Sequence, residues 1–248
     1  MELAGTSSNG SGSDAWARPW GHLKIDRRSI AYCRVTFDHP PINTITATTV
    51  AELAELVDLV EQDTELNVVV FDSANPEFYL ADYDAENDPA PGAGPAGMHA
   101  WLDLLRRLAR APVVSIASIR GRTRGAGSQF VLACDLRFGS RENTVVGRFE
   151  VGTEVVPGGG PVARLSRLVG RGRALEILLV ADDLDGPRAE LYGFVNRLIA
   201  EGRLEAEVEA MAERLGRFDH DAIARTKSNL DRLTLPADSD LPPALPRR

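Results

Sequence analysis

The sequence predicts an α/β fold with a helical C-terminal part, and three observations carry that prediction. Between residues 22 and 147, short apolar runs typical of strands alternate with stretches of helical spacing. From about residue 158 onward the spacing is helical throughout. Hydrophobic residues make up 44% of the 248 residues, which is enough to form a sizeable core. Strand–helix alternation followed by helices is typical of an α/β domain that carries helices at its end.

The first predicted elements are two strands and a loop. Residues 22–38 (HLKIDRRSIAYCRVTFD) predict two strands around a turn at Asp26–Arg28. Residues 39–43 (HPPIN) predict a loop, because proline has no backbone N–H to donate to a sheet.

An amphipathic helix and a buried strand are predicted next. The helix spans residues 46–63, and its apolar residues fall on one stripe. Thr49 and Glu52 have the spacing of a capping box at its start, with Thr46 or Thr48 as alternative caps. The continuous β-branched run at residues 67–73 (NVVVFDS) is typical of a strand buried on both faces.

A long connection separates this strand from the remaining elements. Residues 74–98 are rich in proline, glycine and acidic residues, and loops of this length are often functional. After it the sequence predicts a helix at 99–111, a strand at 112–119, a helix at 125–134, two short strands within 135–147, and helices within 158–234.

The chain is predicted to form one folded unit between two tails. Residues 1–18 are rich in glycine and serine and are expected to form a flexible N-terminal tail. Residues 19–200 are expected to form the core, followed by C-terminal helices at 201–235. Residues 236–248 are expected to form a proline-rich tail.

Charge and cysteine usage exclude several classes of function. The formal net charge of −8 argues against a nucleic-acid partner, because phosphate binding needs a basic surface. Cys33 and Cys134 lie in apolar segments, which predicts buried free thiols and a reducing, cytoplasmic compartment. No metal site is expected, because neither cysteine has metal-ligand spacing. No membrane association is expected, because a signal peptide and a spanning apolar run are both missing.

Two loop–helix junctions give the first functional signal. Residues 78–82 (FYLAD) follow one predicted strand, and residues 125–127 (GAG) follow another at the start of a helix. Backbone N–H groups from two such loops can meet at one carbonyl oxygen and stabilise negative charge that develops on it. Small residues suit this site because they leave the backbone accessible. Glycines at a helix start are also common where a helix packs closely on a strand, so these residues alone leave both interpretations open.

A further stretch turns these features into a family pattern. After residue 147 come Glu150, Glu154, Pro157 and three glycines that open a helix. With it, the order of motifs resembles the enoyl-CoA hydratase/isomerase (crotonase) superfamily over roughly residues 22–230. Five stretches in the same order carry the resemblance: VTFDHPPIN (35–43), NVVVFDSANPEFYLADYD (67–84), PVVSIASIRGRTRGAGSQFVLACDLRFGSRE (112–142), GRFEVGTEVVPGGGPVARL (147–165) and GRALEILLVADDLDGPRAELYGFVNR (172–197).

The resemblance implies a fold, an assembly and a substrate class. The fold is a crotonase-like ββα spiral core with a C-terminal helical region, and the assembly is a homotrimer or homohexamer. The small-molecule substrate is an acyl-CoA thioester, with no separate cofactor because CoA enters as part of the substrate. Family members stabilise an enolate by holding the thioester oxygen between two backbone N–H groups. By register, these groups belong to Asp82 and Ala126.

The two glutamates of family hydratases fall by register on Gln129 and Glu150. A neutral amide cannot act as a general base near pH 7, so the resemblance argues against ordinary hydration of an enoyl-CoA. Gln129 is expected to position water or substrate. Glu150 is expected to act as acid or base at the α- or γ-carbon of the substrate. One carboxylate suffices for double-bond isomerisation, and a lyase reaction needs only the enolate site and a proton donor.

Other positions are expected to contribute to the same site. Glu154 stands where hydratase-like relatives carry a small or apolar residue, and it either replaces the lost carboxylate or points to solvent. Tyr79, Tyr83, Gly125 and Gly158 are expected to contact the substrate.

The sequence therefore favours a single-glutamate isomerase or lyase that acts on an acyl-CoA thioester, and two alternatives stay open. The predicted CoA contacts are acid-rich, whereas phosphates need basic partners. This leaves room for a crotonase-fold tailoring enzyme that acts on a non-CoA carbonyl compound. The missing glutamate also fits a catalytically degenerate homologue that acts as a binding protein. Candidate phosphate partners are Arg28, Arg34, Arg120, Arg122 and Arg124.

Overall fold

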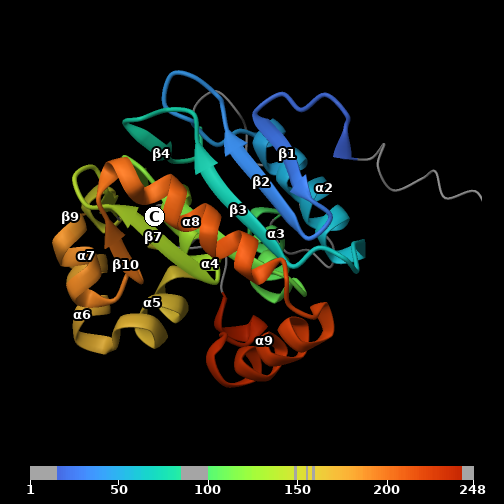
Figure 1. Cartoon of the computed structure of the whole chain (residues 1–248). Coiled ribbons are helices and arrows are strands. Elements are labelled where there is room, and N and C mark those ends of the chain that lie inside the picture. The colour runs from blue at the N-terminus through green and yellow to red at the C-terminus, as the bar shows by residue number, and fades with distance from the viewer. Residues whose placement is uncertain (1–15, 85–99, 148–149, 155, 158–159, 242–248) are drawn as a thin grey trace, which may run out of the picture.

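The computed structural model describes residues 16–84, 100–147, 150–154, 156–157 and 160–241 and shows a mixed α/β fold with two sheets (Figure 1). In the larger sheet β1 pairs antiparallel with β2, and every later neighbour is parallel. The strands, in spatial order, are β1 (Leu23–Ser29), β2 (Tyr32–Phe37), β3 (Val68–Ser73), β5 (Val114–Ile119), β7 (Leu136–Ser140) and β10 (Arg197–Ile199).

A smaller sheet lies beside the first. Its inner strands β4, β6 and β8 are parallel, and β9 closes one edge antiparallel to β8. The strands are β4 (Phe78–Leu80), β6 (Arg122–Arg124), β8 (Val145–Gly147) and β9 (Asp183–Asp185). The sequence analysis missed β4, β6, β9 and β10, because three residues are too few to show an alternating pattern.

Helices cover both faces of the larger sheet (Figure 1). One face packs on α2 (Ala47–Gln62), α3 (Ala100–Arg110) and α4 (Ala126–Ala133), and the other on α8 (Glu201–Leu215). Residues of β3 alternate between the two layers: Val69 and Phe71 join the first, Val68 and Val70 the second. The continuous apolar run in β3 therefore buries both faces, as predicted.

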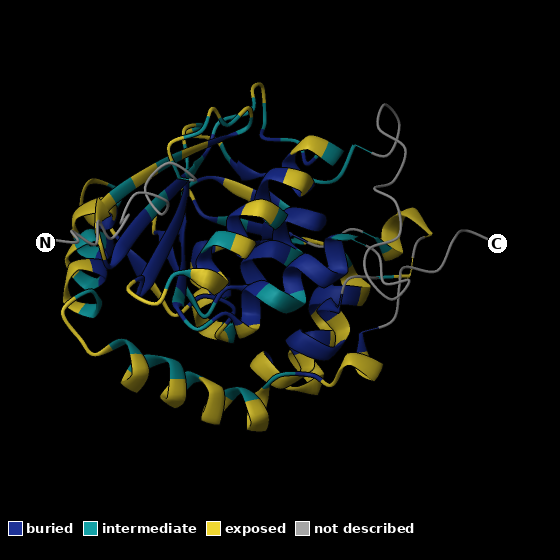
Figure 2. Ribbon diagram, turned by 90° about the vertical axis from the view of Figure 1, so that its right-hand side faces the viewer, coloured by how far each residue is buried: buried dark blue, intermediate teal, exposed yellow. Residues whose placement is uncertain are grey.

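The remaining helices follow β8 along the chain. They are α5 (Pro161–Val169), α6 (Arg171–Leu175), the π-helical turn η3 (Glu176–Val180), α7 (Gly186–Tyr192) and α9 (His220–Thr234), with short 3₁₀ turns η2 (Val151–Thr153) and η4 (Asp238–Asp240). Helix α9 stands at the edge of the molecule and contains no buried residue (Figure 2).

Most predicted boundaries agree with the structure within two residues, and two local predictions were wrong. The first turn lies at Ile30–Ala31 instead of Asp26–Arg28, because β1 continues through these polar residues in register with β2. Thr46, one of the two alternative caps, is the N-cap of α2 and shares a capping box with Thr49 in place of the predicted pair of Thr49 and Glu52. Glu52 instead accepts hydrogen bonds from the backbone N–H groups of Gly21 and His22, which ties the chain before β1 to the helix.

The tails are only partly described. Residues 1–15 and 242–248 lie outside the described residues, whereas Leu241 of the expected proline-rich tail is buried against Leu102 and Ala163. Both cysteines are buried free thiols, as predicted, and burial raises the pKa of Cys33 to about 12. No helix within the described ranges has the length and apolar character needed to cross a membrane.

An aromatic cluster joins the sheet to α4. Phe130 is fully buried, and its ring lies 5.0 Å from Phe71 and 5.3 Å from Phe37, both edge-on. Trp101 of α3 completes the cluster at 6.4 Å. Since this contact holds the helix that begins with Ala126, it also fixes the position of the candidate site.

Phe130→Ala is expected to lower the free energy of unfolding by about 3–5 kcal/mol, because it opens a cavity where four rings meet. Urea unfolding followed by circular dichroism measures the change. Leu191→Ala, at a side chain 69% exposed on α7, is the matched control and should change it by less than about 0.5 kcal/mol. Equal effects of the two substitutions would contradict the assigned role of the cluster.

Candidate active site

The smaller sheet brings three candidate segments to one edge. Strands β4, β6 and β8 run parallel, so their carboxyl ends lie together. Residues 81–82 follow β4, Gly125 and Ala126 follow β6, and Glu150 comes three residues after β8. The register pairs Arg124 with Gly147, which aligns the ends of β6 and β8.

The loop after β4 lies directly on the first turn of α4. The N–H of Gly127 donates to the carbonyl of Ala81 at 3.1 Å, and the N–H of Ala126 donates to Asp82 Oδ1 at 2.7 Å. A Cβ at position 127 would lie 2.1 Å from the carbonyl oxygen of Leu80. Glycine is therefore required at 127, because any side chain would push the two loops apart.

Asn43, in the HPPIN loop, holds the other side of residues 81–82. Its backbone carbonyl accepts the N–H of Ala81 at 3.1 Å, and its side-chain amide donates to the carbonyl of Tyr79 at 3.1 Å. Ile45 adds a bond from its N–H to the carbonyl of Asp82 at 3.1 Å. Asn43 is 1% exposed and has a φ of 55°, a conformation that asparagine tolerates better than most residues. These bonds fix the backbone of Asp82.

The two predicted donors, the N–H groups of Asp82 and Ala126, lie where the loop after β4 meets the first turn of α4. They differ in their hydrogen-bond partners. The N–H of Asp82 makes no hydrogen bond to any part of the chain that the structure describes. The N–H of Ala126 instead donates to the carboxylate of Asp82 itself. Ala126 is the first residue of α4, and Gly125 before it provides no side-chain cap. An anionic oxygen therefore occupies a helix N-terminus, where N–H groups and the helix dipole both favour negative charge.

Gln129 lies three residues after Ala126 on α4, and a hydrogen bond fixes the orientation of its side-chain amide. It is the one residue of α4 that is not buried. Its Oε1 accepts a hydrogen bond from Trp101 Nε1 at 2.8 Å. The indole nitrogen is always a donor, so the amide oxygen must point to Trp101. The amide NH₂, which makes no hydrogen bond to the described residues, is then left as a donor for a substrate oxygen or water.

The two glutamates differ in environment. Glu150 is half-buried at the start of η2, and its Oε2 is shielded from solvent. Glu154 is exposed and ends the same turn in the left-handed conformation, with a φ of 62°. Of the two possibilities for Glu154, solvent exposure agrees better with this position than replacement of the lost carboxylate.

The expected substrate contacts are placed unevenly. Gly125, with a φ of 51°, lies against the Asp82 carboxylate, and Tyr83 is half-buried beside it. The expectation for Tyr79 needs correction: its side chain is fully buried and its hydroxyl donates to the carbonyl of Phe71 at 3.2 Å, because β4 turns it into the core. Gly158 lies outside the described residues.

The candidate phosphate partners already have carboxylate partners. Arg122 and Arg124, on β6 beside the site, share Asp183. Both remain partly exposed. The other pairs are Arg28 with Asp26, Arg34 with Asp72 and Glu205, and Arg120 with Glu201. Among the described residues, no three histidine, cysteine, aspartate or glutamate side chains lie together in a group that could hold a metal ion.

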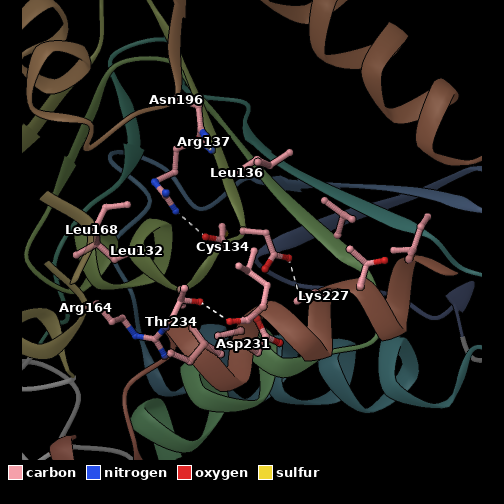
Figure 3. Close-up of a pocket in the computed structure, with 18 of the residues that line it drawn as sticks. Leu132, Cys134, Leu136, Arg137, Arg164, Leu168, Asn196, Lys227, Asp231 and Thr234 are labelled. Atoms are coloured by element: carbon pink, nitrogen blue, oxygen red, sulfur yellow. Dashed lines mark hydrogen bonds and ion pairs between the residues drawn. The ribbon is translucent and has the colours of Figure 1, made fainter. Parts of the chain in front are cut away.

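A cavity of about 790 Å³ lies at the opposite end of α4, between α5 and α9 (Figure 3). Arg137 there donates to the carbonyl of Cys134 at 2.6 Å, and Lys227 pairs with Asp135 at 2.7 Å. Burial, followed by the nearby Arg110, lowers the pKa of Arg164 to about 10. This end of α4 presents carbonyl groups, whereas an oxyanion needs N–H donors. The candidate site is therefore at the N-terminus of α4, away from this cavity.

Sequence reasoning missed two side-chain roles in the site. Trp101 was assigned only to a helix at 99–111, and nothing in its spacing relates it to Gln129. Asp82 was predicted to contribute its backbone N–H, and its side-chain contact with Ala126 depends on how closely the two loops pack. One signal was available: Asp82 carries a carboxylate at a position where its backbone was already expected to lie beside the N-terminus of the helix that begins at Ala126.

Comparison with known proteins identifies the family of the chain. A sequence profile of the enoyl-CoA hydratase/isomerase family matches residues 27–240. The chain is 30% identical over 202 residues to an Arabidopsis thaliana mitochondrial protein assigned as enoyl-CoA hydratase 2, covering 79% of this chain and 66% of that protein. The chain thus spans slightly less than two thirds of the length of this relative.

Two solved structures are similar over most of the chain. One is a Streptomyces avermitilis protein provisionally assigned as an enoyl-CoA hydratase, with a TM-score of 0.83 and 38% identity over 90% of this chain and 82% of the other. The second is an enoyl-CoA hydratase from Mycobacterium avium subsp. paratuberculosis, with a TM-score of 0.80 and 26% identity over 90% of both chains.

The fold is thus that of the crotonase superfamily, as the sequence predicted. The chain belongs to the enoyl-CoA hydratase/isomerase family.

The contact between Trp101 and Gln129 gives a direct test of the site's geometry. A double-mutant cycle with Trp101→Phe and Gln129→Met is expected to give a coupling free energy of about 0.5–1.5 kcal/mol, because each substitution removes one side of the same hydrogen bond. Denaturant unfolding of the four proteins measures it. Strictly additive effects would show that Gln129 is not held by Trp101 in solution.

Proposed function

We propose that this protein stabilises the enolate of an acyl-CoA thioester and acts as a single-glutamate double-bond isomerase or lyase. One observation carries the proposal. The N–H of Ala126 already holds an anionic oxygen at 2.7 Å, and the neighbouring N–H of Asp82 has no partner among the described residues. Fixed backbone donors that face developing negative charge are the main catalytic device of such reactions.

Glu150 supplies the proton transfer in this proposal. In an isomerisation its carboxylate removes a proton from the α-carbon of a 3-enoyl thioester, and negative charge passes to the thioester oxygen in the N–H site. The double bond then forms between the α- and β-carbons when the same proton returns to the γ-carbon. Reactants and products balance without a second acid. The half-buried position of Glu150 next to the ends of β6 and β8 supports this role.

Gln129 argues against hydration as the main reaction. Adding water to the β-carbon needs a base that removes a proton from water, and an amide cannot do this near neutral pH. The hydrogen bond from Trp101 also occupies the amide oxygen of Gln129 and leaves its NH₂ group as the donor. Gln129 is therefore proposed to bind a substrate oxygen or orient water. The relatives described above carry hydratase names, so this proposal departs from them in reaction while sharing their substrate class.

Arg122 and Arg124 are the proposed partners for the CoA phosphates. Both lie on β6, immediately before the N–H site, and their side chains are 48% and 43% exposed. Their shared pairing with Asp183 weakens the attraction, so CoA phosphates would compete with this carboxylate for the guanidinium groups.

An assay of two reactions tests the proposal. The purified protein is given 3-butenoyl-CoA to follow isomerisation, and 2-butenoyl-CoA to follow hydration, both monitored by absorbance. We expect isomerisation to exceed hydration. Glu150→Gln should reduce isomerisation by about 10²–10⁴-fold, the usual contribution of a general acid–base group. Glu65→Gln, at an exposed site remote from the smaller sheet, is the matched control for the charge change.

Three results would redirect the proposal. Isomerisation by Glu150→Gln above about a tenth of the wild-type rate would remove Glu150 from the mechanism. Loss of activity in Glu154→Gln would move the role to Glu154. Turnover of a free β-dicarbonyl compound with no activity on either thioester would favour the non-CoA tailoring enzyme.

The proposed assembly is a homotrimer or homohexamer, and the proposed compartment is the cytoplasm. The unburied α9, with Leu230 and Leu233 58% and 84% exposed, supports self-association, because it lacks a covering surface within the described chain. Two buried free thiols support a reducing compartment. Light scattering coupled to gel filtration should give three or six times the mass of 26.9 kDa, and a monomer would contradict the assembly.

A further inference from the structure

The Asp82 side chain occupies the place where a substrate oxygen is expected. Its Oδ1 accepts the N–H of Ala126 at 2.7 Å. A Cβ at Gly125 would lie 2.2 Å from both Oδ1 and Cγ of Asp82, so the carboxylate rests directly against the loop before α4. Asp82 itself bears the second backbone donor. One residue thus contributes a donor to the site and blocks the other donor.

We propose that the Asp82 carboxylate is an internal competitor for the oxyanion site and sets the affinity of the site for substrate oxygens. A ligand gains the hydrogen bond of Ala126 only when the carboxylate leaves it. This inference rests on the proposed function for the identity of the ligand, while the competition itself rests on the contact between Asp82 and Ala126.

The strength of the competitor follows from its charge. Hydrogen bonds to an ionised acceptor are roughly twice as strong as those to neutral partners. The helix N-terminus adds a favourable field for the same carboxylate. A neutral thioester oxygen is the weaker acceptor and does not recover what is lost when Asp82 leaves. An enolate oxygen is comparable to a carboxylate, so it can take the N–H at little net cost.

The competitor also acts by repulsion. If the carboxylate remains near the site, an enolate oxygen that approaches the N–H of Asp82 meets a like charge on the same residue. Like charges at close range disfavour each other most where water is excluded. Displacement and repulsion therefore change affinity in the same direction, and removal of the carboxylate should relieve both.

The test is a calorimetric titration with acetoacetyl-CoA, whose enolised form resembles the charge that the site is built to hold. We expect Asp82→Ala to bind at least 10-fold more tightly than the wild type, a change of about 1.4 kcal/mol. Asp82→Asn keeps the size and an acceptor oxygen but removes the charge. It should fall between the two, because a neutral amide competes less strongly.

Asp84→Asn is the matched control. It removes one negative charge from the same loop, two residues further on, and therefore reports any general attraction of the polyanionic CoA to a less acidic protein. It should bind within twofold of the wild type. If it binds as tightly as Asp82→Ala, or if Asp82→Ala binds within twofold of the wild type, the internal competitor is overturned.

A second readout does not depend on the ligand. The amide proton of Ala126, bonded to a carboxylate in the wild type, should resonate further downfield in the wild type than in Asp82→Ala or Asp82→Asn. An unchanged Ala126 resonance would overturn the competitor whatever the titration shows. If the resonance moves but no variant binds acetoacetyl-CoA at millimolar concentration, the competitor stands and the acyl-CoA substrate of the proposed function fails.

Discussion

The parallel alignment of β4, β6 and β8 is the constraint on which the candidate site depends. Three short strands end at one edge, and a glycine at 127 lets the loop after β4 approach the first turn of α4. Each strand is only three residues long, so the smaller sheet derives its stability from the larger core. Asn43 holds the loop after β4 by hydrogen bonds, and the aromatic cluster around Phe130 holds α4 against the larger sheet. Together they keep the loop and the helix start in contact.

This architecture separates the part of the chemistry that is fixed from the part that varies. The N–H groups of Asp82 and Ala126 belong to the backbone, so they persist whatever side chains the positions carry. In the proposed mechanism, the groups that move protons are side chains on the adjacent segments. Under the same proposal, Gln129 in place of a glutamate removes one acid–base group and leaves the N–H groups in place, and the hydrogen bond from Trp101 orients the amide. If the proposal holds, the family fold changes its reaction while the two backbone N–H groups stay in place.

The sequence could predict the layout of this fold, but it could not predict the contacts that define the site. Long periodic segments such as 46–63 and the apolar run at 67–73 were predicted well, because their patterns are set by which faces are buried. The short strands β4, β6, β9 and β10 and the inward turn of Tyr79 depend on tertiary pairing, which leaves no local pattern. The register with the family located Gln129 and Asp82, whereas the partners of their side chains, Trp101 and Ala126, depend on distances between helices and loops.

In the proposed site, the backbone and the side chain of Asp82 have opposite effects. The backbone N–H is a donor for the substrate oxygen, and the carboxylate competes with that oxygen for the N–H of Ala126. Its N–H is fixed by the bonds of Asn43 and Ile45 to the neighbouring backbone, and these bonds do not involve the carboxylate. Among the described residues, the carboxylate makes one hydrogen bond, which it accepts from the N–H of Ala126, so its departure costs that bond and none of those that hold the loop. An aspartate here places the competitor within reach because its short side chain matches the close approach that Gly127 permits. Selection at this position can then tune affinity through the side chain while the donor geometry stays constant.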